Sequence, residues 1–176
     1  MNYCLTDYES YARAYRDSVF NNSDKNPILL QNLHLSIECY MKQVIQNEVP
    51  YQKLIKYFAD YDTGTINNRA AKFLERGEIP SHKLKTLARI IALETNYNFP
   101  NPYGQRYNKL NTYIEIFDQF YRNEFRYPGR EELFVLDDEF RKYKKAFQAL
   151  ETVLENIIEQ QNEMYKDTGR EDISLD

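Results

Sequence analysis

The chain has 176 residues, of which 42% are hydrophobic and 28% are charged, and its formal net charge is −4. This composition excludes a disordered chain and is typical of a globular domain with a buried core. The acidic balance argues against nucleic-acid binding by bulk charge, but it leaves room for a local basic patch. The sequence has no long apolar run and no leader-like start, so we expect a cytoplasmic protein without a membrane-spanning helix.

Potential metal ligands are scarce, since the chain has only two cysteines and two histidines. A structural zinc site needs about four nitrogen or sulfur ligands, and Cys4 and Cys39 follow no ligand pattern. The sequence also lacks a glycine-rich phosphate loop, a Ser/His/Asp set and an HExxH motif. It therefore predicts no metal and no cofactor.

Helical spacing of apolar residues predicts two helices in the first third of the chain. Residues 6–9 form the pattern of a capping box, in which the Thr6 hydroxyl accepts from first-turn amides of the first helix. Asn26 is a good N-cap in front of a proline, so the second helix is expected at 27–48. Pro50 ends it.

Residues 50–80 are less regular and predict a short helical insertion. Two short helices are expected within it, at about 51–61 and 67–77. Gly77 is the expected stop of the second of these, because glycine suits the position after a helix. Ser81 is then the expected N-cap of the next helix.

Two further helices are expected at about 107–124 and 137–166, the second being the longest in the chain. Its apolar residues recur every three or four positions from Phe140 to Met164, which is typical of a bundle or a short coiled coil. Gln161 is the one polar position in this seam. The predicted fold is an all-α, up-and-down bundle within one domain, with the long helices antiparallel and residues 167–176 frayed.

Two small groups of polar residues are candidates for a site. His34, Glu38 and Lys42 share one row of the second helix. They form either a half-exposed Glu-to-Lys pair beside the core or a group that places Glu38 at the edge of a groove. Arg76 and His82 are the second group. They are either the end of one helix and the first turn of the next, or a catalytic pair.

A third candidate is the stretch "FYRNEFRYPGREE" at 120–132, in which Arg122, Arg126 and Arg130 recur every four residues. Arginines near the C-terminal end of a helix are favoured by the helix dipole, which is a purely structural explanation. Guanidinium groups that lie close together also form an anion-binding site. Both interpretations stay open at this point.

In their order along the chain, these pieces resemble the HEPN (higher eukaryotes and prokaryotes nucleotide-binding) family of small helical-bundle domains. The similar features are a first helix rich in tyrosine and alanine, the stretch "LSIECYMKQVI" with Glu38 and Lys42, then "HKL", and later "RNEFRYP". The resemblance covers roughly residues 6–48 and 81–128. It implies a dimeric domain of a bacterial defence or toxin–antitoxin-like system.

Active members of this family are metal-independent ribonucleases with an arginine, a polar residue, and a histidine four to six residues after the arginine. Arg122 and Asn123 match the start of this motif, but residues 127–129 are Tyr-Pro-Gly, without a histidine. Tyrosine, with a pKa near 10, is a poor general base at neutral pH. The resemblance therefore implies a non-catalytic domain that binds RNA or nucleotide phosphates through Arg122, Arg126 and Glu38, or binds a protein partner.

Two alternatives stay open. One is a divergent ribonuclease that uses Arg122, Asn123 and Tyr127, or Arg76 and His82. The other is a purely structural helical interaction module in which the arginines only cap and pack. A homodimer is expected in each case, because the last helix carries a long apolar seam and because the resemblance implies dimers.

Overall fold

A computed structural model of the chain describes residues 7–21, 27–60, 63–104, 108–119 and 137–167. Within these ranges the chain forms seven α-helices and no strand, apart from a single bridge between Ala59 and Ile66. The predicted all-α helical bundle is confirmed. The helices are α1 (Tyr8–Phe20), α2 (Pro27–Glu48), α3 (Tyr51–Phe58), α4 (Asn68–Glu75), α5 (Leu84–Glu94), α6 (Lys109–Gln119) and α7 (Asp137–Asp167).

The ends of several helices follow local sequence chemistry. α2 begins and ends as predicted, and Gly77 follows α4 with a φ of 75°, a conformation that favours glycine. The cap of α1 was predicted wrongly. Its N-cap is Asp7, whose carboxylate accepts from the Ser10 N–H at 2.9 Å. A carboxylate is a favourable N-cap because it accepts this hydrogen bond and also interacts with the positive end of the helix dipole.

The start of α5 also differs from the prediction. The helix begins at Leu84, and Ser81 is not its cap. The Leu84 N–H donates instead to the Asp118 carboxylate of α6 at 2.7 Å. Ser81 accepts from the Lys83 N–H at 3.2 Å, in the turn that precedes the helix. The cap therefore comes from a tertiary contact, which local sequence patterns do not show.

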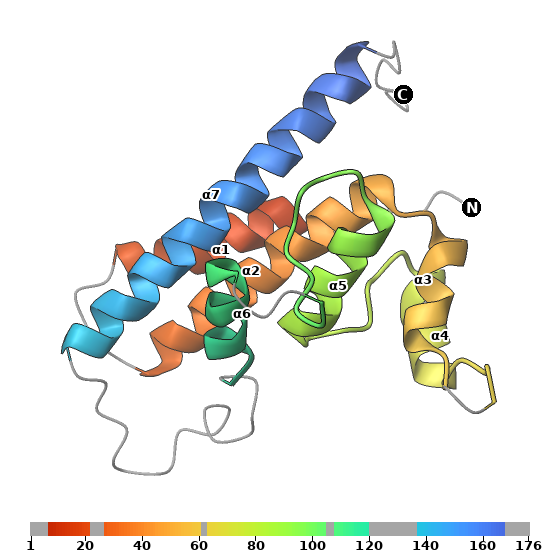
Figure 1. Ribbon diagram of the computed structural model, residues 1–176, viewed down its shortest axis with the longest axis horizontal. Helices are drawn as coiled ribbons and strands as arrows, with labels where there is room; N and C mark the ends of the chain where they lie inside the picture. Colours follow the sequence, from red (N-terminus) through yellow and green to blue (C-terminus); the bar gives the residue numbers. More distant parts are fainter. Residues whose placement is uncertain (1–6, 22–26, 61–62, 105–107, 120–136, 168–176) are drawn as a thin grey trace.

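α2 lies at the centre of the bundle, in contact with α1, α5 and α7 (Figure 1). α1 packs antiparallel to it. The Ser36 hydroxyl donates to the Ala12 carbonyl at 2.8 Å, and the Asn32 side chain donates to the Ser18 hydroxyl at 2.9 Å. Ala12 and Ser36 are buried, and their small side chains let the two helices approach closely.

α7 runs parallel to α2, so the predicted antiparallel arrangement of these two helices is wrong. Tyr40 contacts Glu155 at 3.0 Å and Asn47 contacts Gln161 at 3.0 Å, so both helices advance in the same direction. A short loop would force an antiparallel pair, but here α3 to α6 intervene and carry the chain back.

The apolar seam of α7 is buried within the chain itself. Phe140, Phe147 and Leu154 are buried, whereas Met164 at the end of the seam is 63% exposed. Gln161 is buried and donates to the Val44 carbonyl at 3.1 Å, which explains the polar position in the seam. Intrachain packing thus accounts for the periodicity, and the homodimer stays a prediction without support from the seam.

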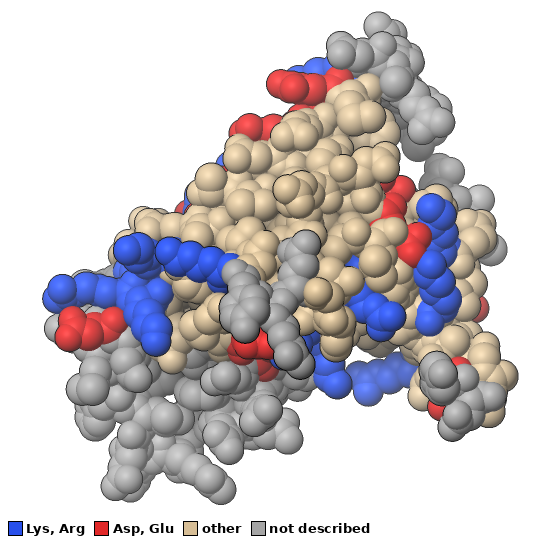
Figure 2. Space-filling view, in the orientation of Figure 1, with Lys and Arg blue, Asp and Glu red and all other residues tan. Residues whose placement is uncertain are grey.

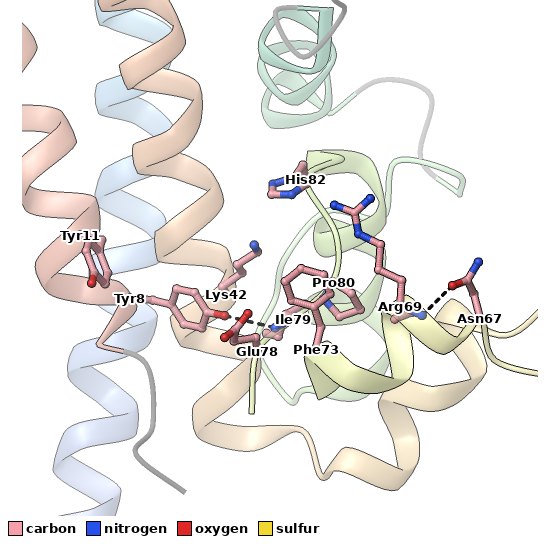
Figure 3. A pocket seen from close by; sticks show the side chains of 11 residues that line it. Tyr8, Tyr11, Lys42, Asn67, Arg69, Phe73, Glu78, Ile79, Pro80 and His82 are labelled. Atoms are coloured by element: carbon pink, nitrogen blue, oxygen red, sulfur yellow. Dashed lines mark hydrogen bonds between the residues drawn. The ribbon is translucent and has the colours of Figure 1, made fainter. Parts of the chain in front are cut away.

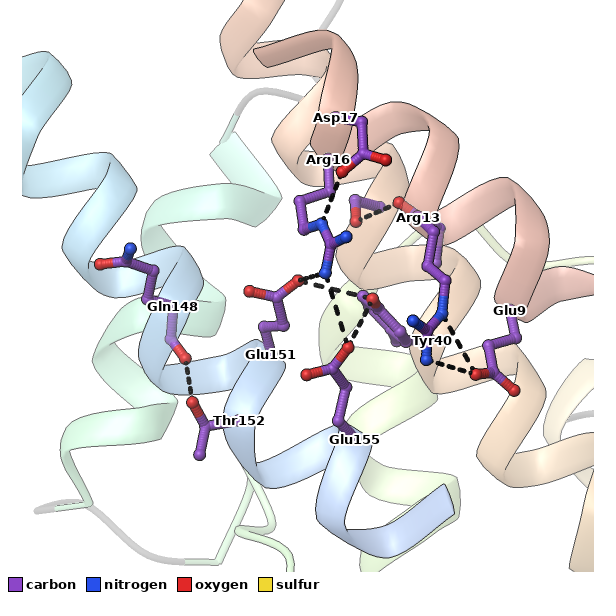
Figure 4. Close-up of polar contacts among 11 residues, drawn as sticks. Glu9, Arg13, Arg16, Asp17, Tyr40, Gln148, Glu151, Thr152 and Glu155 are labelled. Atoms are coloured by element: carbon purple, nitrogen blue, oxygen red, sulfur yellow. Dashed lines mark hydrogen bonds and ion pairs between the residues drawn. The ribbon is translucent and has the colours of Figure 1, made fainter. Parts of the chain in front are cut away.

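A polar cluster joins α1, α2 and α7 (Figure 4). The Tyr40 hydroxyl donates to Glu155 at 3.0 Å, and Arg16 lies 3.4 Å from Glu151 and 3.8 Å from Glu155. Burial raises the pKa of the Tyr40 hydroxyl, so the group stays a hydrogen-bond donor. The cluster satisfies polar groups at the seam of three helices, which is a structural role.

α3 and α4 lie together at one side of the bundle, beside α5 and away from α7 (Figure 1). They correspond to the helices predicted for the insertion at 50–80. The chain returns from α4 through residues 77–83, where the Ile79 N–H donates to the Tyr8 hydroxyl of α1 at 3.1 Å. This buried hydrogen bond ties the returning segment to the first helix.

Candidate anion-binding cavity

The structure describes only part of the predicted site. Four of the predicted residues lie outside the described residues: Arg122, Asn123, Arg126 and Tyr127. The other three, Glu38, Arg76 and His82, are described, and they fall in the region where α2, α4 and residues 77–83 meet.

His34, Glu38 and Lys42 form a buried row on α2, which replaces the half-exposed pair considered from the sequence. Glu38 is 4% exposed and Lys42 is 6% exposed. The Lys42 Nζ lies 2.8 Å from the Glu38 Oε1. The His34 Nδ1 lies 2.9 Å from the Phe117 carbonyl oxygen. The row thus satisfies most of its charge and polarity within the protein.

The other ring nitrogen of His34 completes these contacts. Its Nε2 lies 3.2 Å from the His82 carbonyl oxygen and 3.6 Å from the Glu38 Oε2. Both ring nitrogens of His34 therefore face carbonyl oxygens, which are hydrogen-bond acceptors.

Glu38 connects the buried row to the surface through His82. The His82 Nδ1 lies 2.9 Å from the Glu38 Oε1, and the His82 side chain is 48% exposed. Burial by itself raises the pKa of Glu38. The neighbouring His34 and His82 rings and the Lys42 charge outweigh burial, so the pKa lies well below its usual value of 4.5. Glu38 is therefore an ionised carboxylate that positions Lys42 and His82.

Lys42 and His82 line a cavity of about 750 Å³ between α1, α2, α4 and residues 78–82 (Figure 3). Its lining combines basic and aromatic side chains: Lys42, Arg69 and His82 with Tyr8, Tyr11 and Phe73. Arg69 extends from α4 toward the end of the cavity where His82 lies. The cavity thus brings together residues from distant parts of the chain.

The charges around the cavity are only partly balanced. Lys42 is paired with Glu38, and Glu78 lies 3.2 Å from Arg76. Among the residues that the structure describes, no carboxylate lies within 4.0 Å of the Arg69 guanidinium, which stands 6.0 Å from the Phe73 ring centroid. Arg69 is therefore a lining cation suited to an external anion.

Only some of the residues that line this cavity were predicted from the sequence. The spacing of Arg76 and His82 in the sequence makes them a candidate pair, but Arg76 does not line the cavity and its guanidinium carbon stands 4.9 Å from the Phe73 ring centroid. Tyr11 and Arg69 were not predicted. The i, i+4 pair of Arg69 and Phe73 was visible in the sequence, but nothing there indicated that both residues line a cavity together with α1.

No protein-family model, curated protein or solved structure matches the chain. A function can therefore be proposed only from the geometry of this cavity. None of the described helices is long and apolar enough to cross a membrane. Within the described ranges, no group of three or more His, Cys, Asp or Glu side chains could hold a metal ion.

Proposed function

We propose that this chain is a non-catalytic helical domain that binds nucleotides or RNA in the cavity between α1, α2 and α4. The observation that carries the proposal is the lining of the cavity, where Lys42, Arg69 and His82 accompany Tyr11 and Phe73. Guanidinium and ammonium groups bind phosphate oxygens, and aromatic rings stack on bases. The volume of about 750 Å³ falls in the range of small-ligand sites.

The proposal agrees with the nucleotide-binding role that the HEPN resemblance implies, but it places the ligand on different residues. Glu38 is assigned to holding Lys42 and His82, not to direct ligand contact, because its carboxylate is buried. Membership of the family, binding through Arg122 and Arg126, a homodimer, a protein partner and a defence or toxin–antitoxin-like setting rest on the resemblance and remain predictions. A cytoplasmic location also remains a prediction.

Arg69→Gln is expected to weaken binding of a labelled adenine mononucleotide by about 10-fold to 100-fold, the scale of one charged hydrogen bond. Fluorescence anisotropy at low ionic strength measures the affinity, because phosphate contacts weaken with salt. Lys72→Gln is the matched control, since Lys72 is an exposed cation on the same helix and does not line the cavity.

Two results would contradict this function. Wild-type protein that binds neither mononucleotide nor RNA at low salt would leave the interaction-module alternative. Equal weakening by Arg69→Gln and Lys72→Gln would show that the affinity comes from general surface charge. The Arg69→Gln and Lys72→Gln variants should keep the wild-type melting temperature, because both side chains are exposed.

A ribonuclease is the second candidate function, and the contact between Glu38 and His82 is the observation that favours it. A carboxylate that holds the Nδ1 side of an imidazole fixes the ring, as in known general-base pairs. We nevertheless expect RNA to stay intact, because no histidine follows Arg122 at the family spacing. RNA cleavage that survives a chelator and is lost in His82→Ala would establish a ribonuclease that uses His82. Cleavage that is lost in Arg122→Ala would instead assign the activity to the motif of Arg122, Asn123 and Tyr127.

A further inference from the structure

Arg89 lies outside the cavity, and its guanidinium is close to the rings of two tyrosines. Its guanidinium carbon stands 6.0 Å from the ring centroid of Tyr57 on α3 and 5.4 Å from that of Tyr103 in the segment after α5. Arg89 is exposed, and Tyr103 is 64% exposed. The arginine and the outer ring are therefore both accessible to a ligand.

Glu94, the one acidic residue of α5, has partners other than Arg89. Glu94 accepts from the Tyr57 hydroxyl at 2.6 Å and pairs with Lys56 at 2.6 Å. Within the described part of the chain, no carboxylate lies within salt-bridge distance of Arg89. A guanidinium that lies over aromatic faces keeps its N–H edge for an acceptor from outside, and phosphate suits that edge.

α5 connects Arg89 to the cavity. His82 precedes the first residue of α5, and Arg89 follows His82 by seven residues. With a helical rise of about 1.5 Å per residue, Arg89 lies on the order of 8 Å along the helix from Leu84, the first residue of α5. Basic side chains gather over α3 as well as over the start of α7, although the net charge is −4 (Figure 2).

The geometry points to a longer ligand than a mononucleotide. We propose that the cavity binds one nucleotide of a single-stranded RNA segment, and that Arg89 binds a following phosphate while Tyr103 stacks on its base. This inference rests on the proposed function of the cavity. A single strand is required because an exposed ring stacks only on a base that is not already stacked in a duplex.

Affinities for a labelled single-stranded RNA hexamer and for adenosine monophosphate test the inference. Arg89→Gln and Tyr103→Ala are each expected to weaken hexamer binding about tenfold, the scale of one stacked base, and to leave monophosphate binding unchanged. Arg69→Gln is expected to weaken the binding of both ligands. Arg141→Gln, an exposed arginine near the start of α7, is the control and should change neither affinity.

The outcomes separate this inference from the function on which it rests. Hexamer binding that falls with Arg69→Gln but not with Arg89→Gln would overturn the extended site and leave the cavity. Equal affinity for a duplex of the same sequence would overturn the single-strand assignment. Absence of binding to either ligand in the wild-type protein would overturn both. Melting temperatures of the variants confirm that each remains folded.

Discussion

Glu38→Ala is expected to lower the free energy of unfolding by about 3–5 kcal/mol, because it leaves a buried cation without its partner. Lys42 is 6% exposed and its Nζ lies 2.8 Å from the Glu38 Oε1. His34 also loses the carboxylate that stands 3.6 Å from its Nε2. The substitution therefore removes one charge that serves several buried groups.

Urea denaturation of Glu38→Ala and of Glu9→Ala measures this effect against a matched control. Glu9 pairs with Arg13 at the same i, i+4 spacing and the same 2.8 Å distance, but both side chains are more exposed. Such a surface pair contributes less than about 1 kcal/mol. Equal effects of the two substitutions would show that burial does not strengthen the Glu38 pair.

A double variant distinguishes the loss of the pair from the stranded charge. Glu38→Ala with Lys42→Met removes both charges, and apolar replacements of a buried pair are often neutral. We expect the double variant to recover most of the stability that Glu38→Ala loses. A double variant as unstable as Glu38→Ala would instead assign the cost to the lost contacts with His34 and His82.

The sequence predicted features that depend on neighbours along the chain. Pro27 and Pro50 marked the bounds of α2, and the row of His34, Glu38 and Lys42 follows from helical spacing alone. Burial of the row could not be predicted, because it depends on the helices that cover it. A Glu-to-Lys pair at this spacing has the same sequence pattern on the surface and in the interior.

Features that depend on tertiary contacts were missed for one physical reason. The contact between Glu38 and His82 joins residues 44 positions apart, and Asp118 caps α5 from a distance of 34 positions. The parallel course of α2 and α7 depends in the same way on the path of the helices between them. His82 was singled out by its spacing from Arg76, whereas the structure places it through Glu38.

The second large effect concerns pH. The pKa of Glu38 is lower in the folded chain than its usual value of 4.5, because His34, His82 and Lys42 outweigh the opposing effect of burial. The unfolded chain therefore binds more protons at this residue, and unfolding is favoured as the pH falls. Stability from Glu38 is fully present above about pH 4.5 and is lost progressively below it.

The pKa of Glu151 is shifted in the opposite direction, so this residue serves as an internal control. Burial, followed by the Glu155 charge, raises the pKa of Glu151, so its stabilising contribution is present at low pH and is lost as the pH rises. Glu151→Gln should therefore leave the acid-side loss of stability in place. The charge-free pair variant Glu38→Gln with Lys42→Met should reduce that loss.

The measurement is the free energy of unfolding by urea at several values between about pH 3 and pH 6. With an unfolded pKa of 4.5, such a carboxylate loses at most about 2 kcal/mol of stability between pH 6 and pH 3, so the wild-type protein should lose about that much more than the pair variant does. Parallel pH profiles of the two proteins would contradict the lowered pKa of Glu38. Because its pKa is lowered, Glu38 keeps its charge in the folded chain over this range, so its contact with His82 at the cavity should persist while the free energy of unfolding falls.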